Sequence, residues 1–473
     1  MSIREFREAG HRIVDHLADY LERVEDERLF PEIDPATLNA LFDEPLPREA
    51  SSLHSVLLEL NEKVLPYCTQ VNHPGYFGLI TPSPAPVGIL GDFIASALNQ
   101  NLGVYSIGPS AVAVERRTIR WLTDLIGYGE QAGGNLTSGG MMANLIGLKL
   151  ARDWASKDRA QHEGIRDRWA AYTSEERHVS VDKAADAVGI GREGLRVLPT
   201  DDKFEMRLDA LESALAEDAR QGIRPMAIIA MGGSTNTGAV DSLREIRRIA
   251  DRVGAWLHVD AAYGGGMLLS EKHPGALSGL ELADSVTIDP HKWFYAPLDA
   301  GAILVREEDR LTKSFGLQPA YLLDLDRKDE RYNYYVHGLE QSRRFRSLKV
   351  WMSFKRYGTR EMGSWIDANV DQALRLFDLA SSHPDFEPAV KPRMSAVCLR
   401  YHPAGWEEDR LAPLHAQVAR NIERGGRFWI TTTVLKGKIW FRINPVNFRT
   451  RLEHMDQLFE LLASECRAAR GGA

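Results

Sequence analysis

Asp289-Pro290-His291-Lys292-Trp293 is the stretch that decides the fold, because it places a lysine between two aromatic rings just past an apolar run. Upstream, the apolar run Trp256-Leu257-His258-Val259 ends on an acid, Asp260. Short apolar runs of this kind are typical of buried strands in a mostly parallel sheet, whose ligands bind at the carboxyl ends of the strands. The two stretches therefore predict an acid and a lysine at one edge of an α/β sheet.

This pairing suits pyridoxal 5'-phosphate (PLP), which needs a lysine for its Schiff base and a carboxylate for its protonated ring nitrogen. A lone lysine is usually a surface residue, and an aspartate after a strand usually caps a turn. Here His291 and Trp293 would desolvate the Lys292 amine, and the small residues 261–266 would let a flat ligand approach the backbone beside Asp260. Together these features favour a cofactor site.

The composition is that of a folded globular chain with more than one lobe. The chain has 473 residues, of which 44% are hydrophobic and 26% charged. A net charge of −8 argues against a nucleic-acid partner. The three cysteines are few and widely spaced, no residues cluster with metal-ligand spacing, and no leader or membrane-spanning run is present. We therefore expect a cytoplasmic protein without a metal and without a membrane association.

Residues 1–80 predict an N-terminal helical segment that packs on a partner subunit. Its first helix is amphipathic, so its apolar face needs a covering surface. The apolar residues that recur at helical spacing are Ile3, Phe6, Ile13, Leu17 and Leu21. A proline-rich connector before residue 86 separates this segment from the rest of the chain.

Residues 81–355 predict a large α/β domain, since helical periods alternate there with short apolar runs at 226–230, 256–259 and 302–305. Residues 356–473 predict a small α+β domain. In that domain we expect a strand at 396–399, a helix over 411–423, paired strands around 428–430 and 439–441, and a terminal helix.

Other candidate site residues lie where runs end. Gly139-Gly140-Met141 precedes a helical stretch, an arrangement that binds phosphate through backbone N–H groups, and a second glycine turn surrounds Thr235. His178 follows another strand end, where its ring would stack on a pyridine, although an isolated histidine is more often structural. The charged, tyrosine-bearing segment 318–335 fits either a solvated loop or a lid over the substrate.

With these residues the chain resembles the group II PLP-dependent amino-acid decarboxylases, and within them the aromatic-L-amino-acid decarboxylases. The resemblance spans nearly the whole length and includes the run Arg343-Arg344-Phe345-Arg346-Ser347-Leu348-Lys349. It implies an α/β fold of the PLP-dependent transferase type (aspartate aminotransferase fold type I). It also implies a homodimer with the active site at the subunit interface.

The resemblance assigns roles to individual residues. Lys292 would form the Schiff base, Asp260 would pair with the ring nitrogen, and His291 would face the substrate carboxylate. His178 would stack over the ring and Ala262 would pack beneath it. The phosphate would be held by Thr235, Gly140, Met141 and Asp289. Met141 stands where relatives have a hydroxyl, so its contact is expected from the backbone alone.

The resemblance also implies a proton donor and a substrate pocket. Tyr334 would return a proton to Cα after carbon dioxide leaves, with Tyr332 or Tyr335 as alternatives if the register shifts. A tyrosine at that point favours decarboxylation over aldehyde formation. The side chains that would line the substrate pocket are Leu79, Ile80, Tyr105 and Ser342.

The expected activity is decarboxylation of an aromatic L-amino acid of the tyrosine, dopa, tryptophan or phenylalanine type to its amine. The alternatives are a decarboxylase of glutamate or 2,4-diaminobutyrate and an aromatic aldehyde synthase. A transaminase, a desulfurase and a PLP-fold protein that only binds a partner also remain open, because a fold does not determine the chemistry of its site.

Overall fold

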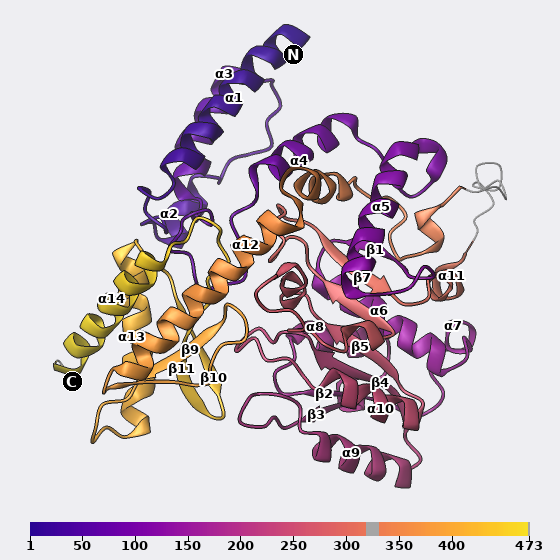
Figure 1. Cartoon of the computed structure of the whole chain (residues 1–473). Coiled ribbons are helices and arrows are strands. Elements are labelled where there is room, and N and C mark those ends of the chain that lie inside the picture. Colours follow the sequence, from indigo (N-terminus) through magenta and orange to yellow (C-terminus); the bar gives the residue numbers. More distant parts are fainter. Residues whose placement is uncertain (318–330, 472–473) are drawn as a thin grey trace.

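The structure is a computed structural model that describes residues 1–317 and 331–471. Most of the segment in which we expected a lid therefore lies outside the described residues. Figure 1 shows a large sheet with helices on both faces, a smaller sheet near the C-terminus, and N-terminal helices α1 and α3 that project from the body of the molecule.

The large sheet has seven strands. Strand β7 runs antiparallel to both of its neighbours, and all other pairs are parallel. The mostly parallel sheet predicted from the apolar runs is thus confirmed. In spatial order the strands are β1 (Gly133–Thr137), β7 (Gly301–Val305), β6 (Ser285–Ile288), β5 (Trp256–Asp260), β4 (Arg224–Met231), β2 (Trp169–Ser174) and β3 (Leu195–Leu198).

Alternating side chains of β5 serve the two faces of this sheet. Leu257 and Val259 join the core on one face, while Trp256 joins the core on the other. Because side chains alternate along a strand, His258 and Asp260 lie on the same face as Trp256. The helices of this region are α5 (Pro109–Ile126), α6 (Gly140–Ala155), α7 (Ala160–Glu163), α8 (Val179–Ala187), α9 (Leu208–Arg220), α10 (Leu243–Val253) and α11 (Asp309–Phe315).

The small sheet is antiparallel and has four strands. The long helix α12 (Ser347–Ser382) connects it to the large sheet and is interrupted at Gly358, whose φ is +67°. The remaining elements are β10 (Thr431–Leu435), β11 (Lys438–Ile443), β9 (Val397–Tyr401) and β8 (Phe386–Pro388), with helices α13 (Glu408–Gly425) and α14 (Leu452–Gly471).

The strand expected around 428–430 begins later, at Thr431. Its apolar residues contact the end of the N-terminal segment instead. The Trp429 N–H donates to the Gly75 carbonyl at 3.0 Å, and the Phe77 N–H donates to the Trp429 carbonyl at 3.0 Å. Their apolar character therefore reflects packing between distant segments, which a run of hydrophobic residues does not distinguish from a strand.

The N-terminal segment contains α1 (Ile3–Arg23), α2 (Pro35–Ala40) and α3 (Leu53–Glu59), and α4 (Pro86–Leu98) follows the proline-rich connector. Helix α1 is the amphipathic helix that the sequence predicts. Most of its apolar face is exposed in the single chain, as is an apolar side of α4. Within the described ranges, no helix combines the length and the apolar character needed to cross a membrane.

Candidate active site

A cavity of about 310 Å³ lies at the carboxyl ends of β4, β5 and β6. This edge of the sheet is where α/β folds bind ligands. The structure brings all of the predicted cofactor-contact residues to this cavity. They are Lys292, Asp260, Ala262, His178, His291, Thr235, Gly140, Met141 and Asp289.

Lys292 lies in the turn that follows β6, and its Nζ is 3.0 Å from Asp289 Oδ2. Trp293 points away from the cavity. Its ring is fully buried against Tyr263, with centroids 5.0 Å apart, and its Nε1 donates to Asn369 Oδ1 at 3.0 Å. Trp293 therefore anchors the turn and is not among the residues that line the cavity, so its expected part in desolvating the Lys292 amine stays a prediction.

His291 has a defined orientation because its Nδ1 accepts a hydrogen bond from the Ala300 N–H at 2.9 Å. Burial lowers the pKa of the His291 imidazole below its ordinary value. A neutral ring whose Nδ1 is an acceptor carries its hydrogen on Nε2. That nitrogen is 3.6 Å from Asp289 Oδ2.

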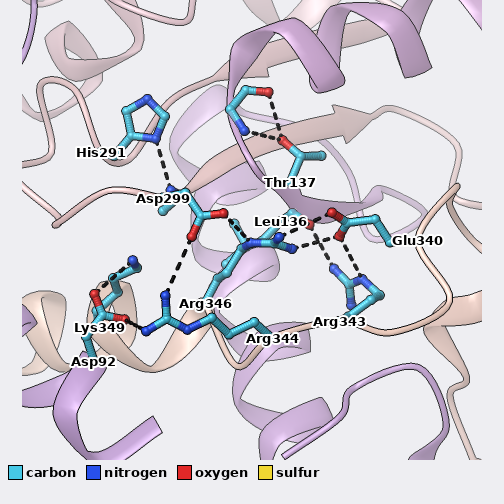
Figure 2. A network of polar contacts seen from close by, with 12 residues as sticks. Asp92, Leu136, Thr137, His291, Asp299, Glu340, Arg343, Arg344, Arg346 and Lys349 are labelled. Carbon is cyan, nitrogen blue, oxygen red and sulfur yellow. Dashed lines mark hydrogen bonds and ion pairs between the residues drawn. The ribbon is translucent and has the colours of Figure 1, made fainter. Parts of the chain in front are cut away.

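The backbone that holds His291 is itself fixed by ion pairs (Figure 2). Asp299 precedes Ala300, and its Oδ2 accepts from Arg346 Nε at 2.9 Å. Arg346 also pairs with Glu340, with Nη1 to Oε2 at 2.7 Å. Other basic residues of the run 343–349 also form ion pairs. These pairs are Arg344–Asp92, Lys349–Asp92 and Arg343–Glu115.

Asp260 ends β5 and turns its carboxylate into the cavity, although it is only 6% exposed. Its Oδ1 accepts from the Ala262 N–H at 3.1 Å, and its Oδ2 accepts from Asn144 Nδ2 at 2.7 Å. Two donors therefore fix the carboxylate in one orientation.

At the glycine turn before α6, neighbouring atoms approach the backbone too closely for a side chain at Gly140. Gly139 has a φ of +155°. A Cβ on Gly140 would lie 2.8 Å from Asp289 Oδ2 and 3.2 Å from the Ala262 Cβ. Helix α6 begins at Gly140, and the first N–H groups of a helix have no intrahelical partner. The turn therefore presents backbone donors to an anion at close range.

His178 is the N-cap residue of α8, where its Nδ1 accepts from the Ser180 N–H at 3.2 Å. Burial lowers the pKa of the His178 imidazole, while the negative charge of Asp260 acts in the opposite direction. His178 and Asp260 both line the cavity.

Comparison with known proteins agrees with this arrangement. Residues 35–402 match the model of the pyridoxal-dependent decarboxylase conserved domain. An aromatic-L-amino-acid decarboxylase of Bacillus atrophaeus is 33% identical over 97% of this chain and 95% of its own length.

The chain belongs to the pyridoxal-dependent decarboxylase family. It is a PLP-dependent carboxy-lyase with a fold of type I, as we expected. A phenylacetaldehyde synthase of Arabidopsis thaliana is 29% identical over 98% of this chain and 96% of that protein. The crystal structure of Oryza sativa TDC with PLP and tryptamine superposes with a TM-score of 0.92 at 27% identity, covering 99% of both chains.

The residues of this decarboxylase fit the cofactor. The turn at Gly140 lines the cavity and begins a helix whose first N–H groups can bind a phosphate, Asp260 supplies a carboxylate within the same cavity, and Lys292 supplies an amine. Among the described residues, no group of three potential metal ligands is found.

The residues expected to bind the substrate do not line this cavity within one chain. The Leu79 side chain is 51% exposed, and Ser342 is exposed as well. Ile80 packs partly against the large core, and Tyr105 packs beside α4 and α5. The single decarboxylase chain thus assembles the predicted cofactor site without the predicted substrate site.

Tyr334, the expected proton donor, is also placed elsewhere. Its ring is 1% exposed and lies under the Arg343 guanidinium, 4.2 Å from it, beside Tyr332. It belongs to the cluster that contains Leu102 and Phe345 and does not line the cavity. Burial raises the pKa of the Tyr334 phenol well above its ordinary value. Within the described chain, its geometry does not support direct proton transfer.

Several cavity residues had no role in the sequence interpretation. Asn144 lies one turn inside α6 and Ser180 lies at the start of α8, and both are buried. The signal in the sequence that could have identified them is a polar residue at a helix position that should face the core. Met231 is another cavity residue that had no role in the sequence interpretation. The remaining lining residues, Gly139, Gly233, Ser234 and Tyr263, lie in the glycine turns and in the segment 261–266, which we had already expected near the cofactor.

Proposed function

We propose that this enzyme decarboxylates an aromatic L-amino acid, of the tyrosine, dopa, tryptophan or phenylalanine type, to the amine and carbon dioxide. The observation that carries this proposal is the 33% identity to the Bacillus atrophaeus decarboxylase over 97% of the chain. The likeness to a structure crystallised with tryptamine supports it. We include a cytoplasmic location in the proposal, since the three cysteines are free thiols.

When bound, PLP supplies an electron sink for the bond to the departing carboxylate. We propose that Lys292 holds the cofactor covalently and that Asp260 pairs with its ring nitrogen. His178 and Ala262 would contact the two faces of the ring. An ionised carboxylate only accepts hydrogen bonds, so Asp289 cannot donate to a phosphate. Asp289 would instead hold the Lys292 amine. The phosphate would be bound by the N–H groups of the turn at 139–141 and by Thr235.

His291 is proposed to orient the substrate carboxylate. Its Nδ1 is already occupied by the Ala300 N–H, so the ring offers a donor at Nε2 on the cavity side. A neutral donor binds the carboxylate without holding it as strongly as a full positive charge would, and this difference favours release of carbon dioxide. The ion pairs behind Ala300 keep this donor in place.

We further propose that the active enzyme is a homodimer whose interface completes the substrate site. Apolar side chains of α1 and α4 line one cleft of about 430 Å³, including Phe6, Val14 and Phe93. Leu79, Ser342 and Tyr105 lie outside the cavity of their own chain, so a role in substrate binding would require them to act on the site of a partner.

A panel of amino acids tests the proposed substrate class. We expect carbon dioxide and amine in equal amounts from at least one aromatic L-amino acid, and little turnover of glutamate or 2,4-diaminobutyrate. Activity confined to acidic or basic substrates would refute the aromatic assignment.

The likeness to phenylacetaldehyde synthase favours one second candidate, an oxidative aldehyde synthase. That reaction would be recognised in the same panel by hydrogen peroxide, ammonia and aldehyde appearing alongside carbon dioxide. A keto-acid requirement would indicate a transaminase instead.

Lys292→Ala tests the cofactor assignment independently of the substrate. We expect this variant to lose the absorbance band of covalently bound PLP, because no amine would remain at that position. Lys313→Ala is the matched control, since that lysine is exposed and pairs with the exposed Asp309. An unchanged band in Lys292→Ala would contradict the assignment.

A further inference from the structure

Asn144 connects Asp260, which is proposed to pair with the ring nitrogen of the cofactor, to Ser180, which bonds to His178. Its side chain is 1% exposed, and its amide has all four hydrogen bonds that an amide can form. Nδ2 donates to Asp260 Oδ2 at 2.7 Å and to Ser180 Oγ at 2.8 Å. Oδ1 accepts from Thr287 Oγ1 at 2.7 Å and lies 3.0 Å from His258 Nε2.

The chemistry of these partners determines which way each hydrogen points. The Asp260 carboxylate can only accept, so the Asn144 atom that faces it must be the NH₂ group. The carbonyl oxygen of Asn144 then faces His258, and His258 Nε2 must carry a hydrogen. The direction follows from the partners alone and needs no assignment of hydrogens in advance.

His258 continues this chain of bonds into the sheet. It is fully buried, and burial lowers the pKa of its imidazole to about 4, so the ring is neutral at physiological pH. With its hydrogen on Nε2, Nδ1 must accept, and Ser285 Oγ lies 2.8 Å from it. Ser285 can donate there because Trp256 Nε1, which is only a donor, already supplies the hydrogen bond that Ser285 accepts, at 2.8 Å.

The other branch reaches His178. Ser180 Oγ accepts from Asn144, so its own hydrogen is free to point to His178 Nδ1, 2.8 Å away. The Ser180 N–H donates to the same nitrogen at 3.2 Å. His178 Nδ1 is therefore an acceptor, and the ring hydrogen of neutral His178 lies on Nε2.

The packing of α6 on β5 provides the space for these hydrogen bonds. Trp256, His258 and Asp260 alternate onto one face of β5, against which α6 packs. Gly147 lies one turn after Asn144 on that helix, and a Cβ there would approach the His258 ring to 2.5 Å. The glycine therefore makes space for the imidazole between helix and sheet.

We propose that Asn144 and His258 are positioning residues that orient the Asp260 carboxylate toward the cofactor ring and, together with the Ser180 N–H, hold the tautomer of His178 through one directed chain of hydrogen bonds. This relay consists of Trp256, Ser285, His258, Asn144 and Ser180. The proposal rests on the proposed roles of Asp260 and His178. It adds that both roles depend on residues that do not need to touch the cofactor.

The first experiment compares PLP affinity among purified full-length variants, measured as retention of the cofactor absorbance during dialysis. Asn144→Asp places an acceptor against Asp260, and His258→Leu removes the donor to Asn144. We expect each to weaken PLP binding about tenfold or more. His258→Gln keeps an N–H group near the position of Nε2 and should restore affinity to within about threefold of the parent.

His415→Leu is the matched control for the loss of a buried histidine. His415 is also fully buried, but its two nitrogens face the backbone carbonyls of Ile439 and Tyr401 in the small domain. We expect this variant to lower the melting temperature and to leave PLP affinity unchanged. Equal loss of affinity in His415→Leu would show that the His258 effect is one of general stability and would overturn the proposal.

Asp260→Asn separates failure of this proposal from failure of the proposed site. If Asp260→Asn retains full PLP affinity, the role of Asp260 itself is wrong. If Asp260→Asn weakens PLP binding while Asn144→Asp and His258→Leu do not, the relay is refuted and the proposed role of Asp260 is retained. None of these outcomes depends on which amino acid is the substrate.

A second experiment reads the direction of the bonds directly. In holoenzyme labelled with ¹⁵N-histidine, the signals that disappear in the His258 and His178 variants identify these two rings. Both should show the tautomer protonated at Nε2. Ser180→Ala should alter the His178 signal while PLP affinity stays within about threefold of the parent, since Asn144 still binds Asp260. Protonation of His258 at Nδ1 would overturn the proposal.

Discussion

At the residue scale, two neighbouring polar residues of β5 have different relations to the cavity. Asp260 and His258 lie on the same face of one strand, yet only Asp260 lines the cavity. Position along β5 accounts for the difference, because the carboxylate stands at the strand end while the imidazole is enclosed between the sheet and α6. The hydrogen bond that joins His258 to the cavity residues runs through Asn144.

The pH dependence of stability should report the burial of His258. Its pKa is lowered from 6.5 to about 4, so the unfolded chain binds this proton first as the pH falls. Stability is then lost between about pH 6.5 and 4. Because glutamine does not titrate, His258→Gln should have a shallower loss, by up to about 1.4 kcal/mol per pH unit. Urea unfolding across this range measures it, and parallel profiles for the parent and the variant would contradict the expectation.

The identity of the residue that returns a proton to Cα can also be tested by single substitutions. Tyr334 is buried under Arg343 away from the cavity, so we now expect Tyr334→Phe to retain most of the amine yield. The same substitution made separately at Tyr321, Tyr332 and Tyr335 gives the comparison, with Tyr321 lying outside the described residues. Product analysis of the four variants measures the yield of amine and aldehyde. Loss of amine in Tyr334→Phe alone would restore our original assignment.

At the scale of elements, the junction between β1 and α6 is the place where we propose that a phosphate binds. A methyl group at Gly140 would lie 2.8 Å from Asp289 Oδ2 and 3.2 Å from the Ala262 Cβ, so one of these groups would have to move. We expect Gly140→Ala to weaken PLP binding by about tenfold or more, at little cost to the fold.

Gly129→Ala is the control for that substitution, since a Cβ at Gly129 would meet nothing within 4 Å. Dialysis against PLP-free buffer measures both variants. Equal PLP retention in the two would show that the close approach at Gly140 does not matter for the cofactor.

Element boundaries also show which signals in the sequence were sufficient. The strands at 226–230, 256–259 and 302–305 were predictable, because a strand that is buried on both faces of a sheet is a short apolar run between turns, whichever direction it runs. The run at 428–430 has the same appearance but packs on residues 75–77. Hydrophobicity indicates burial in both cases, and only the partner decides the conformation.

At the scale of the whole molecule, the apolar faces of α1 and α4 are the surfaces on which the proposed dimer depends. Phe6 and Phe93 line one cleft and are 47% and 53% exposed in the single chain. We expect Phe6→Asp combined with Phe93→Asp to convert a dimer into a monomer, because charge at a buried interface is strongly unfavourable. Light scattering during size-exclusion chromatography measures the mass.

Val434→Asp is the control, since Val434 is a similarly exposed apolar residue on β10, remote from α1 and α4. This variant should retain the parent's mass. A parent enzyme that is monomeric at micromolar concentration would contradict the dimer and, with it, the proposed origin of the substrate pocket.

The sequence by itself determined the large sheet, the cofactor and many, but not all, of the residues that line the cavity. It did so because ligand residues of an α/β fold follow strand ends, and strand ends are visible as the limits of apolar runs. Asp260, Lys292 and the turn at Gly140 were found in this way. Only the tertiary structure decided that Trp293 faces the core, that Tyr334 is buried under Arg343, and that Asn144 joins Asp260 to His258. These depend on contacts between residues far apart in the chain, and such contacts have no local pattern to read.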